Sequence, residues 1–257
     1  MRDYNVYSYT VLHYGVSYLP YALKSVYNLC DRLYIFYTPH PSHGHKTDIP
    51  PIESREELLV SANSFYASEA KISWHETDIW NEGQQRDYAV QTLTHDNAGL
   101  ILVCDYDEIW HEHVLDKALR HVWEMNGARN WLINFTHMWR SFNYACTDSN
   151  WPVRIIDTRH SGGIGYVPKE LGDIYHMGYA VTDKVMRYKW ECHGHKDELR
   201  PNWYEDKWLA WPPPDDCHPT NGKNDEGVGW WNPQPFDKRE LPYVLRSHPW
   251  FSVDKIE

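Results

Sequence analysis

The stretch Leu100-Ile101-Leu102-Val103-Cys104-Asp105-Tyr106-Asp107-Glu108 decides how this chain is interpreted. An unbroken apolar run ends abruptly in carboxylates, and short apolar runs of this kind are typical of strands buried in a parallel sheet. Ligands bind such sheets outside the carboxyl ends of the strands. Asp105 and Asp107 are therefore expected at a binding site, where their oxygen atoms suit Mg²⁺ or Mn²⁺. The alternative is that both residues begin a solvated loop and cap the next helix.

The first 110 residues alternate between strand and helix patterns. Strands are expected at Val6–His13, Arg32–Tyr37, Lys71–His75 and residues 100–104, and helices at Ser17–Asn28, from Ser54 to about Glu69, and at Glu82–Leu93. Ser54 and Glu57 have the spacing of a capping box, which marks the start of the second helix. The alternation predicts an α/β fold with a mostly parallel sheet and crossover helices.

Regular patterns become sparser after residue 110. We expect a helix at Val114–Trp123, strands at Asn130–His137 and Val153–Thr158 with a loop at Arg140–Trp151 between them, and a helix at Thr182–Glu191. The remainder, which is rich in proline and aromatic residues, is expected to be irregular with short helices. No repeat or linker divides the sequence, so residues 1–257 are predicted to form a single domain.

Composition narrows the classes of function. Of the 257 residues, 24% are charged and 42% are hydrophobic, as in globular proteins, and the net charge of −11 argues against a nucleic acid or an anionic membrane as partner. No apolar stretch approaches the roughly 20 residues of a membrane span, and the first residues lack the pattern of a signal peptide. Five scattered cysteines fit a reducing compartment. A cytoplasmic location is expected.

The chain contains 14 Trp and 19 Tyr residues, an unusually large number. Flat rings stack on sugars and nucleobases, but they also fill cores. The sequence leaves both interpretations open for a tryptophan cluster in the final third, which comprises Trp190, Trp203, Trp208, Trp211, Trp230, Trp231 and Trp250.

Several segments together resemble the GT-A fold of nucleotide-sugar glycosyltransferases, especially the short family-2-like enzymes. The matching segments are Tyr18–Val26 at the first helix, Cys30–Ile35 at the second strand, Glu82–Asp87 with its Gly-x-x-Arg pattern, and Asp105-Tyr106-Asp107 as the Asp-x-Asp motif. The resemblance implies a Rossmann-like sheet in which Asp105 and Asp107 hold Mn²⁺ or Mg²⁺. That cation would bridge the diphosphate of the donor and neutralise the leaving group.

The same resemblance assigns roles to further residues. Residues 1–110 would bind the nucleotide sugar and residues 111–257 the acceptor. His176 would complete the metal shell, although an ordinary histidine at a strand end is an equal alternative. The other residues expected to contact the donor are His13, Tyr14, Tyr37, Thr38, Arg86 and Lys189, together with Asp105. Arg86 would add a positive charge to a helix N-terminus, which is itself an anion site.

The catalytic base is less clearly marked. An inverting transferase needs a carboxylate that deprotonates the acceptor hydroxyl, and Asp173 has the expected position. Its rivals are Glu170, Glu205 and Asp206, and a retaining enzyme would need no such base. Trp139 and Arg140 are candidates for clamping an acceptor sugar, or else a core tryptophan and a structural ion pair.

The resulting hypothesis is a metal-dependent glycosyltransferase that moves a sugar from a nucleoside-diphosphate sugar to a saccharide or glycan hydroxyl. The alternatives are a non-catalytic carbohydrate-binding protein and a phosphohydrolase of the haloacid-dehalogenase type, in which the first aspartate of a similar motif is the nucleophile. A zinc site formed by Cys192-His193-Gly194-His195 with Cys217-His218 is also conceivable, but its spacing matches no familiar ligand pattern.

Overall fold

The computed structural model describes residues 2–40, 50–64, 71–147, 151–192, 199–220 and 232–257. Its first sheet contains β1 (Val6–Leu12), β2 (Arg32–Tyr37), β3 (Ile72–Glu76), β4 (Leu100–Val103), β6 (Asn130–Leu132), β9 (Val153–Asp157) and β10 (Ile164–Tyr166). Its second sheet contains β5 (Glu108–Ile109), β7 (Phe135–Trp139), β8 (Tyr144–Thr147), β11 (Ile174–Tyr179) and β12 (Gln234–Pro235). The α-helices are α1 (Leu19–Val26), α2 (Arg55–Asn63), α3 (Glu82–His95), α4 (Glu112–Met125) and α5 (Asp183–Glu191).

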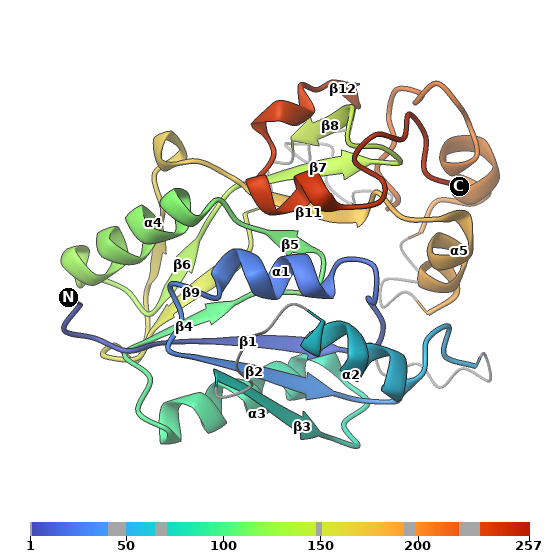
Figure 1. Cartoon of the computed structure of the whole chain (residues 1–257). Coiled ribbons are helices and arrows are strands. Elements are labelled where there is room, and N and C mark those ends of the chain that lie inside the picture. Colours follow the sequence, from blue (N-terminus) through green and yellow to red (C-terminus); the bar gives the residue numbers. More distant parts are fainter. Residues whose placement is uncertain (1, 41–49, 65–70, 148–150, 193–198, 221–231) are drawn as a thin grey trace.

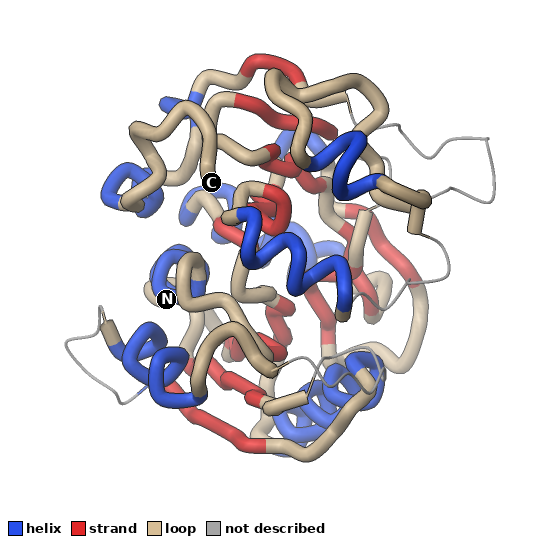
Figure 2. Tube along the Cα trace, turned by 90° about the vertical axis from the view of Figure 1, so that its right-hand side faces the viewer, coloured by secondary structure: helices blue, strands red, loops and turns tan. Residues whose placement is uncertain are grey.

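The first sheet has the order β10-β6-β9-β4-β1-β2-β3, and only β9 runs against its neighbours. The predicted α/β architecture with a mostly parallel sheet flanked by helices is therefore confirmed (Figure 1). The second sheet has the order β12-β8-β7-β11-β5 and mixes parallel and antiparallel pairs. Figure 2 shows the strands of the two sheets as two groups, one above the other, with helices around them.

Alternation along the strands explains how the first sheet is covered. On β1, Leu12 packs with α1 and α2, while Tyr9 faces the opposite side, where α3 lies. Leu102 and Ile101 of β4 separate in the same way between the two faces. Successive side chains of a strand point to opposite faces, so the helices on both sides bury every residue of β1 and β4.

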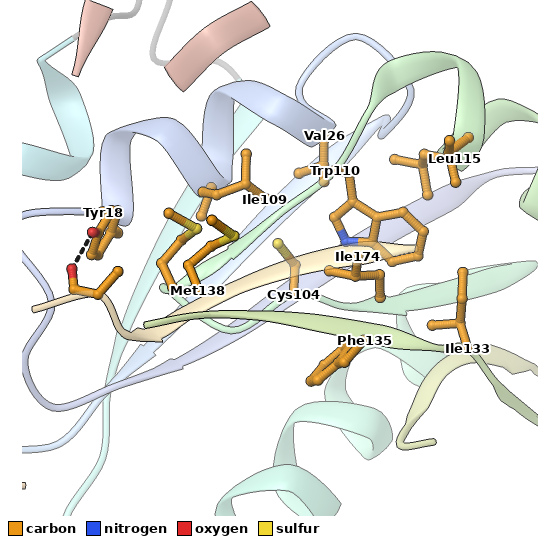
Figure 3. Packing of buried hydrophobic residues seen from close by; sticks show 14 of the residues in the cluster. Tyr18, Val26, Cys104, Ile109, Trp110, Leu115, Ile133, Phe135, Met138 and Ile174 are labelled. Carbon is orange, nitrogen blue, oxygen red and sulfur yellow. Dashed lines mark hydrogen bonds between the residues drawn. The ribbon is translucent and has the colours of Figure 1, made fainter. Parts of the chain in front are cut away.

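The largest core cluster joins residues from both halves of the sequence, from Val6 to Ile256. Figure 3 shows Val26 of α1 and Ile109 of β5 near Trp110, with Phe135 and Met138 of β7 in the same cluster. Tyr18, at the start of α1, donates a hydrogen bond to the carbonyl oxygen of Ala180. This core holds the second sheet against α1, so loops from both sheets meet at one end of the first sheet.

Two expectations for the second half were wrong. The expected strand at Asn130–His137 is two strands, β6 and β7, which belong to different sheets. The expected loop at Arg140–Trp151 contains β8, and β11 was not predicted. Of the tryptophan cluster, for which the sequence left both interpretations open, Trp203 and Trp208 are almost fully buried in the core and Trp190 and Trp250 pack against it partly exposed, while Trp230 and Trp231 lie outside the described residues.

Three further findings concern the cysteines, membrane-spanning helices and the proposed zinc segment. All five cysteines are buried and free of disulfides. Within the described parts of the chain, no helix is long and apolar enough to cross a membrane. The proposed zinc segment lies partly outside the described residues, since these end at Cys192 and resume at Leu199.

Candidate functional site

A cavity of about 190 Å³ lies at the carboxyl ends of β1 and β4. It is lined by Val11, His13, Tyr14, Glu82, Arg86, Asp105, Tyr106, Asp107, His176 and Lys189. These residues come from the ends of β1 and β4, from α3, from β11 and from α5. The structure thus brings together most of the residues expected at the site, although the lining extends along the sequence from Val11 to Lys189.

Asp105 faces the side of the sheet that α3 covers. Its neighbour Cys104 continues the ladder of β4, donating its backbone N–H to the carbonyl oxygen of Tyr9 (3.0 Å), and belongs to the opposite core cluster. Alternation then turns Asp105 toward Arg86. Nη2 of Arg86 donates to Oδ1 and Oδ2 of Asp105 at 3.1 and 2.9 Å, and Nη2 of Arg154 donates to Oδ2 at 3.1 Å.

These contacts fix the charge of Asp105. Burial alone would raise its pKa, but the adjacent guanidinium groups of Arg86 and Arg154 outweigh that effect and lower the pKa to about 2. A carboxylate offers about four lone-pair sites, and three of them already accept hydrogen bonds here. Asp105 therefore has room for about one further partner.

Asp107 points instead toward β11. Its Oδ2 lies 3.6 Å from Nε2 of His176, and its backbone carbonyl accepts a 2.7 Å hydrogen bond from the N–H of Met177. The residue is 4% exposed, and burial raises the pKa of Asp107 to about 6 although Lys189 opposes the shift. The carboxylate is held in a position where a cation would stabilise its charged form.

Gly178 makes room for this pair. A Cβ atom at residue 178 would lie 2.6 Å from Cε1 and 2.7 Å from Nε2 of His176, and 2.8 Å from Oδ2 of Asp107. The absence of a side chain there lets the β11 backbone approach both groups closely.

His176 is kept neutral by its surroundings. Burial lowers its pKa well below the ordinary value, and the positive charge of Lys189 acts in the same direction. A neutral imidazole has a lone pair that can bind a metal ion. The structure places His176 beside Asp107, and its role in a metal shell stays a prediction.

Glu108 and Arg154 were not predicted as site residues. Nη2 of Arg154 lies 2.5 Å from Oε1 of Glu108, its Nε donates to both carboxylate oxygens, and the Glu108 side chain is 1% exposed. Burial raises the pKa of Glu108 above its usual range, with Arg154 opposing the shift. Only the antiparallel pairing of β9 with β4 brings Arg154 to the motif, and no local signal in the sequence indicates that pairing.

Two cations complete the cavity wall. Nζ of Lys189 donates to the carbonyl oxygen of Gly178 (3.2 Å), and burial lowers the pKa of Lys189 while Asp107 opposes the shift. Arg86 also pairs with Glu82 at 2.6 Å, but its Nη1 is buried without a hydrogen-bond partner among the described residues. A buried unpaired donor is costly, so Arg86 has unused capacity for an anion.

His13 and Tyr14 lie at the end of β1. Nδ1 of His13 donates to the carbonyl oxygen of Thr38 (3.1 Å), because a carbonyl oxygen can only accept. In the neutral ring, Nε2 then accepts from the hydroxyl of Tyr188, and burial lowers the pKa of His13. The loop after β1 is thus fixed to α5 next to the carboxylates.

The side chains of the cavity suit a divalent cation that takes its remaining ligands from molecules other than this chain. Four carboxyl groups (Glu82, Asp105, Asp107 and Glu108) and three cations (Arg86, Arg154 and Lys189) lie in and beside the cavity. Asp107 and His176 offer an oxygen and a nitrogen, a combination that suits Mn²⁺ better than Mg²⁺. In the described part of the chain, no group of three or more His, Cys, Asp or Glu side chains is placed so that it could by itself hold a metal ion.

The structure does not bring every expected residue to the cavity. Tyr37 and Thr38 are buried at the end of β2 and do not line it. Asp173, whose Oδ2 accepts a hydrogen bond from Thr136 (2.9 Å), is also absent from the lining, as are Glu170, Glu205 and Asp206. The role of Asp173 as a base stays a prediction that the geometry of the cavity does not support.

Trp139 and Arg140, the candidates for clamping an acceptor sugar, are instead a core tryptophan and a partner in a structural ion pair. Arg140 is fully buried, pairs with Asp183, and donates to the carbonyl oxygen of Trp208. Trp139 is fully buried as well and stacks on Tyr179. Neither side chain is accessible to a sugar.

A larger hollow of about 620 Å³ lies between α1, α2 and the C-terminal segment. Its lining includes Pro20, Tyr21, Val60 and Trp250, with Glu56 and Glu57 as its carboxylates. It contains none of the expected site residues.

No family model matches this chain, and no curated protein matches its sequence. Among solved structures, glucosyl-3-phosphoglycerate synthase from Mycobacterium tuberculosis, crystallised with Mn²⁺, uridine diphosphate and phosphoglyceric acid, is 9% identical with a TM-score of 0.35. That match covers 54% of this chain and 44% of the synthase. A Desulfovibrio desulfuricans G20 protein that carries the name of a nucleotide-diphospho-sugar transferase is 9% identical, with a TM-score of 0.38 and coverage of 69% and 83%. At these TM-scores, neither likeness carries a functional argument.

Proposed function

We propose that this chain is a divalent-cation-dependent glycosyltransferase that moves a sugar from a nucleoside-diphosphate sugar to a hydroxyl group of a saccharide or glycan. One observation carries the proposal. Asp107 and His176 share a cavity with Arg86 and Lys189, at the carboxyl ends of parallel strands. Such an edge is where open α/β sheets bind ligands, and this one offers cation ligands and phosphate partners together.

Residues of different charge would bind different parts of the substrate complex. Asp107 and His176 would hold the cation, with Asp105 supplying one further lone pair. The guanidinium of Arg86 and the ammonium of Lys189 would bind phosphate oxygens, and His13 and Tyr14 would lie on the nucleoside side. A bound cation supplies neutralisation of the charge that develops on the leaving diphosphate. Residues 111–257 would provide the acceptor side.

The first test is a thermal-shift screen of UDP-, GDP- and dTDP-sugars, each with and without Mn²⁺. A ligand that binds only the folded state raises its stability by mass action. We expect a shift with one nucleotide class that appears only when Mn²⁺ is present. No shift with any donor, together with no binding of Mn²⁺ by electron paramagnetic resonance, would refute the proposal.

The Asp107→Asn variant tests the site itself. It keeps the size of the side chain but removes the carboxylate, so we expect roughly a tenfold or larger loss of Mn²⁺ affinity and no metal-dependent thermal shift. Its unfolding temperature should match or exceed the parent's, because an ionised buried group is removed. Asp87→Asn is the matched control, since Asp87 is exposed on α3 beside Arg86 and does not line the cavity. Unchanged Mn²⁺ binding in Asp107→Asn would contradict the assigned role.

A further inference from the structure

His137 and His176 lie opposite each other on the parallel strands β7 and β11. Paired residues of neighbouring strands point to the same face of a sheet, so the two rings meet. Their Nδ1 atoms are 2.8 Å apart, and the ring planes are nearly perpendicular at 86°. His137 is 5% exposed and does not line the cavity, whereas His176 does.

A contact between two Nδ1 atoms has a strict chemical consequence. One ring must donate the single hydrogen between them and the other must accept it. In a neutral imidazole, a hydrogen on Nδ1 leaves the lone pair on Nε2. The location of this hydrogen therefore decides whether Nε2 of His176 presents a lone pair or an N–H to the cavity.

Two features favour the hydrogen on Nδ1 of His176. The 3.6 Å separation between Nε2 of His176 and Oδ2 of Asp107 is too long for a hydrogen bond, so an N–H there would gain no hydrogen bond from Asp107. The ammonium of Lys189 lines the same cavity and attracts a lone pair rather than an N–H.

We propose that His137 is a positioning residue that accepts a hydrogen bond from Nδ1–H of His176 and so directs the Nε2 lone pair of His176 at a divalent cation. This inference rests on the proposed function. Phe135 stacks nearly parallel to the His176 ring, at 10° and 5.4 Å, and limits its tilt. The hydrogen bond to His137 fixes the remaining rotation within the ring plane. Partners of this kind typically change metal affinity by about 10- to 100-fold.

Two variants of His137 separate hydrogen bonding from packing. In His137→Asn, the amide oxygen can take the place of Nδ1 and accept the same hydrogen bond, whereas His137→Leu offers no acceptor. We expect His137→Leu to weaken Mn²⁺ binding by roughly 10- to 100-fold, and His137→Asn to change it by less than about threefold. Met138→Leu is the control, because Met138 is the next residue of β7, is fully buried, and points to the other face.

The measurement combines Mn²⁺ titration by electron paramagnetic resonance with ¹⁵N–¹H long-range spectra of the histidine rings. The spectra are recorded for the metal-free protein and for the protein with Mg²⁺ and UDP. We expect His176 to carry its hydrogen on Nδ1 in both. Circular dichroism and thermal melts verify that each variant folds, and His137→Asn keeps the test decisive if His137→Leu does not.

The outcomes distinguish this inference from the function on which it rests. If the parent protein binds no Mn²⁺, the proposed function fails, whatever the state of the histidine pair. If the parent binds Mn²⁺ but His137→Leu binds it equally well, the positioning role is refuted. A hydrogen on Nε2 of His176 in the parent protein would also refute it.

Discussion

Asp105 and Asp107 are separated by one residue and yet have opposite electrostatic environments. Asp105 lies between two guanidinium groups, which lower its pKa to about 2 against the effect of burial. Asp107 has no arginine within ion-pair distance among the described residues, and burial raises its pKa to about 6. Of the two, Asp107 is therefore the carboxylate whose charge a bound cation would stabilise more.

The close approach at Gly178 leads to a prediction for a single added methyl group. In Gly178→Ala, the new Cβ would lie within 2.8 Å of both Asp107 and His176, so these side chains must move apart. We expect Mn²⁺ affinity to fall by at least tenfold and the free energy of unfolding to fall by about 1–3 kcal/mol. Electron paramagnetic resonance titration and urea unfolding measure the two effects.

Gly162→Ala provides the control for that substitution. A Cβ at residue 162 would meet nothing within 4 Å, so neither Mn²⁺ affinity nor stability should change noticeably. Equal Mn²⁺ affinity in Gly178→Ala and the parent would show that the space beside residue 178 is not used for the cation.

For single residues, the sequence indicates which side chains belong to the candidate site but not which side chains they contact. The Asp-x-Asp motif, Arg86 and His176 could be selected as site residues because their local patterns match a known fold. Glu108 belongs to the same acidic stretch, but its role depends on Arg154, which lies 46 residues further along the chain. His137 could not be selected, since its contact with His176 arises from the pairing of β7 with β11.

At the scale of elements, local signals located the boundaries well where they were chemically explicit. Ser54 and Glu57 form the expected capping box, in which Oγ of Ser54 accepts from the N–H of Glu57 (3.2 Å). Oε2 of Glu57 accepts in return from the N–H of Ser54 (2.7 Å). The helix begins at the next residue, Arg55, because these side chains satisfy backbone groups that the first turn leaves unpaired.

This capping box predicts how much stability is lost when the hydroxyl group of Ser54 is removed. In Ser54→Ala, the N–H of Glu57 loses its acceptor, so the free energy of unfolding should fall by about 1 kcal/mol. Urea unfolding followed by circular dichroism measures the change. Glu57→Gln should cost much less, because a glutamine can also close a capping box. A similar loss in Glu57→Gln would indicate that the charge of Glu57 contributes as much as the hydroxyl group of Ser54.

The sequence did not reveal the break between strands β6 and β7. Residues 130–139 have no glycine or proline, so their pattern indicates one continuous strand. In the structure, Ile133 and Asn134 carry the chain from the first sheet to the second. That change of sheet is decided by which strands are available for pairing on each side, which is a property of the assembled fold.

For the whole molecule, the C-terminal segment closes the structure by returning to α1. Nε2 of His248 donates to the carbonyl oxygen of Ser17 (3.0 Å), and its ring stacks on Tyr18 at 4.8 Å. Nδ1 of His248 accepts from the N–H of Trp250 (3.1 Å). Both ring nitrogens are thus used by a neutral imidazole, and a second ring hydrogen would remove the acceptor for Trp250.

This arrangement predicts a dependence of stability on pH. Burial lowers the pKa of His248 to about 4, whereas a histidine of the unfolded chain has a pKa of about 6.5. Between these values the unfolded state binds more protons, so the contribution of His248 is present above pH 6.5 and is lost as the pH falls toward 4. Its loss between pH 7 and pH 5 should be about 2 kcal/mol.

Urea unfolding of the parent and of His248→Gln at pH 7 and pH 5 tests this contribution. The variant should be less stable than the parent at pH 7, because it loses the stacking on Tyr18, but its stability should fall less between the two pH values. His95→Gln is the control, since the side chain of His95 is 92% exposed. If His248→Gln and the parent lose equal stability between pH 7 and pH 5, the acid sensitivity of this fold must come from other groups. The return of the C-terminal segment would then not depend on a neutral imidazole.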